Sequence, residues 1–497
     1  MTPSGNSGSS WRFNDDDVHR DDAQCWGYPN LAQEVVVNDE HHPEWQGSNV
    51  YGLIRVITDD GMQHLVGTVS KAARIVDFTT GKTVYDFASF GAKPRSGGDS
   101  YGAVAYWRGR YYFGGWIIAP HPAGAAFDTT DKYTYLISTT DLVDWTIHLK
   151  DKAPDSLSWQ AEISDLVATN DHLYILRGDT AGGGTGTGLW RYDGVEITHV
   201  ATGPAIYGAL NEDTLWYSVR DCDSIGTLDL NTDTSAARIL TDVPTMTGGT
   251  KTWESVWQGG SAILAGRVHA FCADGFFVLL QDAPDTQVFV PCVMSATPHD
   301  KRVLGWRSQM AYAAGGLVVA ANTADTDRLG GTSAQQSLLL WIGPNGQVRI
   351  LDTGGMFSGI VVFADRLYYG LSANPHGNNF NNHQVGGITL SSIPLSDIKR
   401  TTVALYERVY NPQAINGVWG GYPTLGYTHG KAILTPDAAG TLTIWQWSAE
   451  RMNQSLGTVT FTAGQTQAID LSPYFAGGII GFSYSDEGTL EGSIALW

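Results

Sequence analysis

Acidic and aromatic side chains, together with one arginine, recur just ahead of similar apolar segments along the chain. Carboxylates accept hydrogen bonds from hydroxyl groups, and aromatic faces stack on sugar rings. If the segments converge in space, such a set predicts a binding site for a polyol or a sugar. Its members are Glu44, Trp45, Asp99, Glu162, Asp165, Tyr207, Glu254, Trp257 and Arg307.

Three of these residues, Glu44, Glu162 and Glu254, also fit a catalytic interpretation. Glycoside hydrolysis needs two carboxyl groups, one of them protonated, on either side of the glycosidic bond. Arg307 would then steer a charged group of the substrate. The competing interpretation is structural, because strand caps and ion pairs between sheets use the same residue types. We favour the structural interpretation and assign no catalytic residue.

Other motifs that carry chemistry are incomplete. The glycine-rich run 182–188 lacks the lysine of a phosphate-binding loop, and segment 229–240 lacks the glycine and the closing glutamate of a calcium loop. His41, His42 and the polar loop 374–383 lack the spacing of metal ligands. The four cysteines form no CxxC pair, and no nucleophile elbow or convincing Ser/His/Asp order is present. We therefore expect neither a metal nor a cofactor.

The elements that would position the polar set are β-hairpins. Seven copies of one hairpin signature recur at intervals of roughly 45–60 residues. Each copy has small or polar residues, an apolar strand, a short turn and a second strand rich in Tyr, Val, Leu or Trp. The copies span residues 49–69, 100–117, 162–177, 205–219, 254–272, 307–322 and 357–371.

Each unit is expected to hold four antiparallel strands. In the second unit they are predicted at 101–107, 110–117, 133–138 and 145–149, and in the third at 163–168, 172–177, 188–192 and 196–201. In the fourth unit they are predicted at 205–210, 214–220, 224–229 and 237–242. A unit of this size cannot bury both faces of a sheet alone, so the units must pack against one another. The pattern predicts an all-β fold, a seven-bladed β-propeller whose first strands line a central channel. The polar set would then surround one mouth of that channel.

The ends of the chain differ from the repeat. Residues 1–40 are polar and predict an extended N-terminal arm, residues 41–410 the propeller, and residues 411–497 a C-terminal region. The C-terminal strands alternate apolar and polar residues but lack the opening signature. They therefore favour a small β-sandwich-like appendage that anchors or oligomerises the protein, over the alternative of an eighth blade.

Composition narrows the function. A formal net charge of −20 argues against binding to the phosphate backbone of nucleic acid. Dispersed acidic residues with few lysines suit a halophilic protein, and also ordinary secreted or viral β-proteins. No leader-like segment opens the sequence and no apolar run is long enough to cross a bilayer, so we expect no membrane insertion.

Pro43, Glu44 and Trp45, leading into residues 47–53, resemble an uncharacterised family of archaeal proteins with propeller-like repeats. The similarity is best over roughly residues 40–380 and implies the fold and an archaeal origin, but no activity. The additions at both ends, with the acidic surface, are typical of a virion component of an archaeal tailed virus.

These observations together predict a non-enzymatic protein on a virion surface: a tail fibre, receptor-binding or capsid decoration protein. Its partners would be a host surface glycan or glycoprotein and other structural subunits, and it would form a homo-oligomer. The alternatives are a glycoside hydrolase or polysaccharide lyase that uses carboxylates at the channel mouth, and a cytoplasmic scaffold.

Overall fold

The computed structural model describes a chain of β-strands joined by short turns. The described parts contain no α-helix, and their three 3-10 helices are Ala88–Phe90, Leu395–Asp397 and Ser472–Gly477. The described residues are 33–37, 50–69, 74–91, 97–99, 103–119, 131–153, 162–178, 186–203, 205–219, 224–239, 260–264, 267–272, 275–280, 287–291, 303–304, 310–321, 323–324, 337–343, 348–354, 356–372, 388–398, 404–410, 419–424, 426–448, 451–485 and 490–497.

In the described parts of residues 33–394, seven antiparallel sheets follow one another, six with four strands and one with five. The first three sheets contain β2 Val50–Ile57, β3 Gln63–Val69, β4 Arg74–Asp77 and β5 Lys82–Tyr85; β6 Gly97–Asp99, β7 Val104–Trp107, β8 Arg110–Ala119, β9 Asp131–Thr139 and β10 Trp145–Lys152; and β11 Glu162–Ala168, β12 Leu173–Gly178, β13 Gly188–Tyr192 and β14 Ile197–Thr202.

The next four sheets continue the same pattern. They contain β15 Ala205–Asn211, β16 Thr214–Val219, β17 Ser224–Asp229 and β18 Thr234–Ile239; β19 Gly260–Leu264, β20 Arg267–Cys272, β21 Gly275–Leu280 and β22 Gln287–Pro291; β24 Met310–Ala313, β25 Gly316–Ala321, β27 Ser337–Ile342 and β28 Val348–Gly354; and β29 Met356–Phe363, β30 Arg366–Ser372, β31 Ile388–Pro394 and β1 Gln33–Val37. A separate short pair joins β23 Val303–Leu304 to β26 Thr323–Ala324.

The strands predicted for the second to fourth units lie close to those observed, with one shift. The last strand of the fourth unit, predicted at 237–242, is β18 at Thr234–Ile239. The reason is local: the Asp229 carboxylate accepts the N–H groups of Asn231 and Thr232, and Asp233 adopts a left-handed φ of 54°. Because of this tight turn, β18 begins at Thr234 instead of residue 237. The start of segment 229–240, which resembles a calcium loop in sequence, is therefore a hairpin turn.

The sheets pack face to face, which explains their apolar middle strands. All six residues of β12 are buried, because a neighbouring sheet covers each of its faces. Tyr112 and Leu136 of the second sheet share one core with Ile163 and Ile175 of the third. Outer strands such as β10 and β14 instead hold half-buried and exposed residues. Burial on both faces of the middle strands thus follows from stacking of the repeats.

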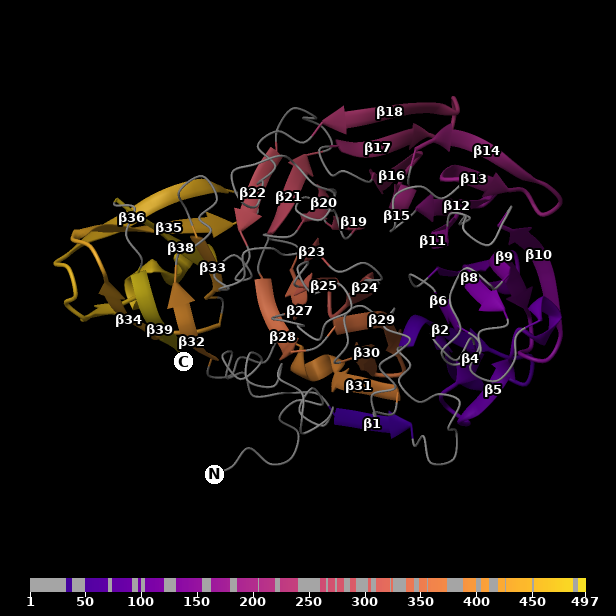
Figure 1. The fold of residues 1–497 in the computed structure, drawn as a ribbon, viewed down its shortest axis with the longest axis horizontal. Coiled ribbons are helices and arrows are strands. Elements are labelled where there is room, and N and C mark those ends of the chain that lie inside the picture. The colour runs from indigo at the N-terminus through magenta and orange to yellow at the C-terminus, as the bar shows by residue number, and fades with distance from the viewer. Residues whose placement is uncertain are drawn as a thin grey trace.

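The sheets form a ring in which the first strands lie innermost (Figure 1). Around the ring, contacts run from β2 to β7, β11, β15 and β19, then through β25 and β29 back to β2. Two equivalent hydrogen bonds join neighbouring sheets at two separate places in the ring. Buried Ser164 donates to the carbonyl of Ala205 at 2.9 Å, and buried Ser358 donates to the carbonyl of Val50. The last sheet therefore meets the first by the same contact that joins the third to the fourth. The arrangement is propeller-like.

The N-terminal strand completes the last sheet. β1 pairs antiparallel with β31 over the full register from Gln33↔Ser392 to Val37↔Ile388, and Figure 1 shows it at the outer edge of that sheet. A segment within the predicted N-terminal arm thus supplies the fourth strand of a sheet whose other strands lie more than 300 residues later.

Two further sheets, formed from the end of the chain, lie beside the ring (Figure 1). One has the order β32-β39-β34-β37 and the other β33-β38-β35-β36. Their strands are β32 Ala404–Tyr410, β33 Trp419–Pro423, β34 Gly430–Pro436, β35 Gly440–Ser448, β36 Arg451–Phe461, β37 Gln467–Asp470, β38 Ile479–Tyr484 and β39 Leu490–Leu496. β32 pairs with β39 and so belongs to these sheets, although it precedes the predicted boundary at residue 411.

One hydrophobic core connects the C-terminal sheets to the ring. Buried Leu317, Leu340 and Ile342 of the ring pack in the same cluster as Leu442 and Phe482 of the C-terminal sheets. The two regions therefore share an apolar interface. Over the described residues, no helix is long and apolar enough to cross a membrane.

Candidate ligand-binding mouth

The predicted site residues divide into those that the structure describes and those that it does not. Glu44, Trp45, Glu254, Trp257 and Arg307 lie outside the described residues. Of the remaining four, Asp99 ends β6, and its backbone pairs with Trp116, but its side chain is not described. Glu162 and Asp165 lie in β11 and Tyr207 lies in β15, two neighbouring inner strands.

A β-bulge in β11 sets the directions of Glu162 and Asp165. The pairing with β12 shifts between Ile163 and Asp165, leaving Ser164 as the extra residue. Ser164 turns inward, where its hydroxyl contacts the carbonyl oxygens of Leu176 and Ala205. Glu162 is 6% exposed and Asp165 is partly exposed. Bulges of this kind re-aim side chains at the ends of strands.

Asp165 holds two neighbouring sheets together. One carboxylate oxygen accepts the N–H of Leu166 at 2.8 Å, and the other accepts the N–H of Gly208 in the next sheet at 2.9 Å. Burial among the inner strands raises the pKa of Asp165 to about 7, although both backbone N–H groups act in the opposite direction. The side chain is therefore a fixed acceptor whose charge changes near neutral pH.

The side chain of Tyr207 is buried and does not face solvent. The pairing of β15 with β16 shifts between Ala205 and Gly208, and Tyr207 lies within this irregular stretch. Its side chain is 3% exposed. A ring that is this deeply buried offers no open face for a sugar to stack on, so the predicted stacking role of Tyr207 is not supported by its placement.

A buried arginine near Glu162 was missed by the sequence reasoning. Arg177 ends the apolar part of β12, and its guanidinium contacts the Asp151 carboxylate of the preceding sheet at 3.0 Å, with side chains 4% and 42% exposed. The guanidinium also lies 5.5 Å from the ring centre of Trp190. Burial lowers the pKa of Arg177, and Asp151 opposes that shift. The one signal in the sequence is a charged residue that ends the apolar run LYILR.

These residues share the end of the ring at which the inner strands begin. Glu162 opens β11, and its pairing partner Gly178 directly follows Arg177. Asp151 lies near the end of β10, the outer strand of the neighbouring sheet. We call Asp151, Glu162, Asp165, Arg177 and Trp190 the mouth cluster. Arg177 contacts Asp151 of the second sheet, whereas Asp165 contacts Gly208 of the fourth, so the polar groups of the mouth cluster lie toward both neighbours of the third sheet. Carboxylates and a guanidinium at one end of the ring are groups that can hydrogen-bond the hydroxyl groups of a polyol.

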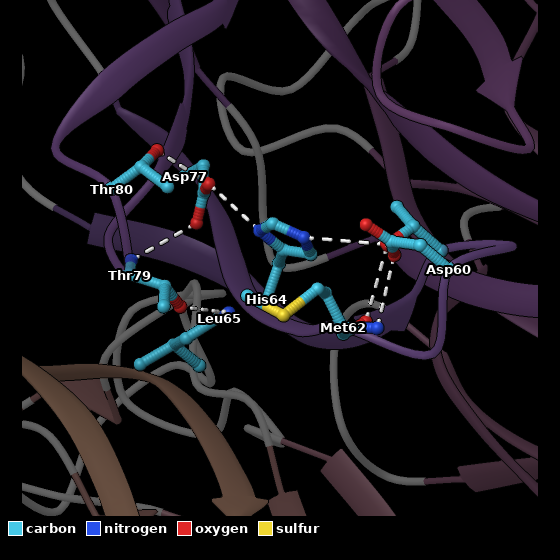
Figure 2. A network of polar contacts seen from close by, with 8 residues as sticks. Asp60, Met62, His64, Leu65, Asp77, Thr79 and Thr80 are labelled. Atoms are coloured by element: carbon cyan, nitrogen blue, oxygen red, sulfur yellow. Dashed lines mark hydrogen bonds and ion pairs between the residues drawn. The ribbon is translucent and has the colours of Figure 1, made fainter.

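The opposite end of the first sheet carries a Thr-His-Asp arrangement (Figure 2). Nδ1 of His64 contacts the buried Asp77 carboxylate at 2.9 Å, and Nε2 lies 3.4 Å from the Thr58 hydroxyl. That hydroxyl donates instead to Asp60 at 2.6 Å, and this bond is the largest cause of the lowered pKa of Asp60. The threonine proton is thus directed away from His64, so the group is not a base-activated nucleophile.

The contacts around His64 explain what the network does. The second Asp77 oxygen accepts the N–H of Thr79, and the Thr79 hydroxyl accepts the N–H of Leu65. The network therefore ties the β2–β3 hairpin to the turn after β4. In the described part of the chain, no group of three His, Cys, Asp or Glu side chains is arranged to hold a metal ion.

Comparisons with known proteins bear on the family and the fold. Residues 68–344 match the model of a family described as "Uncharacterized protein conserved in archaea (DUF2139)". No curated protein matches the sequence.

Among solved structures, a putative oxidoreductase (glucose dehydrogenase) from Thermus thermophilus is 12% identical, with a TM-score of 0.33 over 73% of this chain and 98% of that one. An aldose sugar dehydrogenase from Streptomyces coelicolor is also 12% identical, with a TM-score of 0.34 over 73% and 99%. A glycoside hydrolase family 43 arabinoxylan arabinofuranohydrolase from Bacillus subtilis is 11% identical, with a TM-score of 0.28 over 79% and 94%. Likeness this weak carries no argument about activity.

Proposed function

Because the family model matches more than half of this chain, the chain belongs to that archaeal family, and from that premise we propose that it is a non-enzymatic binding protein. In this proposal the ring is a seven-bladed β-propeller, and the C-terminal sheets are a β-sandwich-like appendage that anchors or oligomerises it. The mouth at which the inner strands begin binds a host surface glycan or glycoprotein.

The observation that carries the proposal is the hydrogen bonding of the Asp165 carboxylate. Both of its oxygens accept backbone N–H groups, one from its own strand and one from the neighbouring sheet. A carboxylate held in this way is oriented to accept hydrogen bonds from hydroxyl groups, but it is not free to move onto a glycosidic bond. This preorganised acceptor supports a binding function.

The Arg177–Trp190 contact supports the same function. The guanidinium is buried, stacked on the indole and neutralised in part by Asp151, so its donors have a fixed direction. Preorganised donors and acceptors reduce the entropy lost when a ligand binds. The proposed site also includes Trp45, Trp257 and Arg307, which the sequence pattern assigns to it and which lie outside the described residues.

A glycan array probed with the full-length chain tests this proposal. We expect binding to a subset of glycans, and loss of at least tenfold in affinity for Trp45→Ala, Trp257→Ala and Arg307→Ala. Val195→Ser is the matched control, because Val195 is 92% exposed in a turn at the other end of its sheet. Absence of binding to every glycan, or equal binding by all four variants, would contradict the proposal.

The hydrolase alternative makes a different forecast in the same assay. Of its three glutamates, Glu162 is the one within the described residues, and it is 6% exposed. Catalysis would release new reducing ends from bound glycans, and Glu162→Gln would abolish that release while leaving binding intact. Intact glycans after prolonged incubation support the binding function.

We place this function on the surface of a virion, as a tail fibre, receptor-binding or capsid decoration protein. The archaeal family and the acidic composition support an archaeal, salt-adapted setting. Antibody labelling of purified virus particles and of cell fractions tests the location. Label confined to the cell fractions would exclude the virion.

A further inference from the structure

Exposed apolar side chains gather at the end of the ring opposite the mouth cluster. Each lies in, or within three residues of, a turn that joins the first to the second or the third to the fourth strand of its sheet. In an antiparallel sheet of four strands these two turns lie at the same end. The exposed large apolar residues in the described part of the ring are Ile57, Met62, Tyr106, Val143, Ile147, Val195, Leu210 and Tyr312.

Contacts between sheets show that these turns share one face of the ring. Arg108, in the first turn of the second sheet, donates to the carbonyl of Asp193 at 2.7 Å and to the carbonyl of Asp171 at 3.0 Å. Asp171 lies in the turn between β11 and β12 of the third sheet, and Asp193 lies in the turn between β13 and β14. Similarly, Arg191 of β13 contacts Asp233, which lies in the turn between β17 and β18 of the fourth sheet, at 2.7 Å.

The inner strands repeat an apolar residue at one register position near this end. The first strand of each sheet has an apolar residue directly opposite the second residue of the second strand. These residues are Val56, Tyr106, Val167, Leu210, Ile263, Tyr312 and Val362. We call these seven positions the exit collar. Tyr106 is 57% exposed, Tyr312 60% and Leu210 37%, Val167 and Val362 are half-buried, and Val56 is buried, whereas the side chain of Ile263 lies outside the described residues. Because the inner strands ring the centre, these positions lie near the centre of the face that carries the first turns.

The turns just beyond the exit collar carry negative charge. Their exposed acidic residues are Asp59, Asp60, Asp171, Glu212, Asp213 and Asp365. Arg108 is the exposed cation among the described residues of these first turns, and it is already held by two carbonyl groups and by the ring of Trp107 at 4.5 Å. An apolar ring bordered by carboxylates is complementary to a cationic partner with apolar anchors.

We propose that the exit collar docks a partner protein through a segment that carries apolar or aromatic side chains flanked by lysine or arginine. Exposed tyrosines are frequent anchors of interfaces, and the surrounding carboxylates would steer the basic segment toward them. A second copy of this chain does not fit, because its net charge of −20 would place like charges together. The proposal is independent of the glycan site, which lies at the other end of the ring.

A fluorescein-labelled Lys-Lys-Leu-Phe-Lys-Lys peptide is the probe for fluorescence anisotropy with the full-length chain. The control peptides are Lys-Lys-Gly-Ser-Lys-Lys, which lacks the apolar anchors, and Glu-Glu-Leu-Phe-Glu-Glu, which reverses the charge. The collar variants are Tyr106→Ser and Tyr312→Ser, and the matched control variant is Val195→Ser. Asp213→Lys and Asp365→Lys, in exposed turns, test the charge without altering the collar. Far-UV circular dichroism and thermal melting confirm that each variant folds.

We expect the basic apolar peptide alone to bind, and to bind less tightly as salt rises because its carboxylate contacts are screened. Each collar variant and each charge reversal should weaken binding at least tenfold, whereas Val195→Ser should not. Equal binding of the Gly-Ser peptide would mean that the peptides bind through charge alone, and this result would overturn the proposal. Unchanged binding by the collar variants, absence of binding by the native chain, or dimerisation through this face would overturn it as well.

Discussion

Two half-buried titratable groups, Asp165 and His148, should give the protein opposing and nearly cancelling dependences of stability on pH. Asp165 has a pKa raised to about 7 by burial, against an ordinary value of 3.8. His148 has a pKa lowered to about 4, against 6.5, by burial first and by the nearby positive charge of Arg110 second. Both lie at contacts between neighbouring sheets, so unfolding exposes both.

The hydrogen bonds of His148 explain why it stays neutral. Arg110 can only donate, and its Nε–H donates to the Ser138 hydroxyl at 2.8 Å. In the neutral tautomer with the proton on Nδ1, the Ser138 hydroxyl donates to Nε2 of His148 at 2.7 Å, and Nδ1–H of His148 donates to Tyr192 at 3.1 Å. Tyr192 passes its own proton to the carbonyl of Gly194 at 2.7 Å. A second proton on His148 would end the bond that Nε2 accepts and would place a second positive charge beside Arg110.

The sign of each contribution follows from linkage. A raised carboxyl pKa means that the folded state binds the proton more tightly, so its contribution is fully present below pH 3.8 and is lost as pH rises through 7. A lowered histidine pKa means that the unfolded state binds the proton more tightly. Its contribution is therefore present above pH 6.5 and is lost as pH falls through 4.

The magnitudes are similar because each pKa unit corresponds to about 1.4 kcal/mol. The shift of Asp165 converts to about 4 kcal/mol and that of His148 to about 3 kcal/mol, both as upper values because each side chain keeps some contact with solvent. Between pH 4 and 6.5 the folded state holds one extra proton on Asp165 and the unfolded state one on His148, so the two slopes cancel.

Urea unfolding of single and double variants separates the two groups. The native chain should show little change from these groups between pH 4 and 6.5. Asp165→Asn should become more stable relative to the native chain as pH rises, and His148→Gln as pH falls. Asp193→Asn is a control of opposite sign, since backbone hydrogen bonds from Glu196 and Val195 lower the pKa of that exposed carboxyl. Profiles of Asp165→Asn and His148→Gln that parallel the native profile would refute the reasoning.

Further predictions concern the closure of the ring. An added methyl group in Gly370→Ala would lie 2.7 Å from the carbonyl oxygen of Val50, so we expect a loss of about 1–3 kcal/mol in unfolding free energy, and an unchanged urea midpoint would contradict this close approach. Ser358→Ala should cost about 1 kcal/mol by removing its bond to the Val50 carbonyl, and Ser164→Ala should cost a similar amount; a large loss in one alone would mean that the two contacts are not equivalent. Deletion of residues 1–37 removes the pairing of β1 with β31, so we expect faster hydrogen exchange in β31 while β12 keeps its protection.

The strands were predictable because their pattern is local. Alternating apolar residues, bounded by Asp, Asn and Gly turns, predicted the strands of the second to fourth units close to their observed places. The short run QEVVV, by contrast, is an ordinary apolar segment in a polar region. Its pairing with β31 depends on closing a loop of more than 300 residues, which no local pattern reveals.

The candidate site was less predictable for a related reason. Glu162 and Asp165 could be found from their place in the repeat, but their roles depend on the bulge at Ser164 and on the N–H of Gly208 in another sheet. Tyr207 was expected to face a ligand, and the irregular pairing of β15 buries it instead. The contact of Arg177 with Asp151 joins two sheets, and charge spacing along the sequence does not indicate it.

An experimental map of the full-length chain, saturated with a glycan that it binds, tests the central claim most directly. We predict density for the sugar at the end of the ring where the inner strands begin, in contact with the mouth cluster. Sugar density on the outer edges or on the C-terminal sheets, or a map in which β29 does not meet β2, would contradict it.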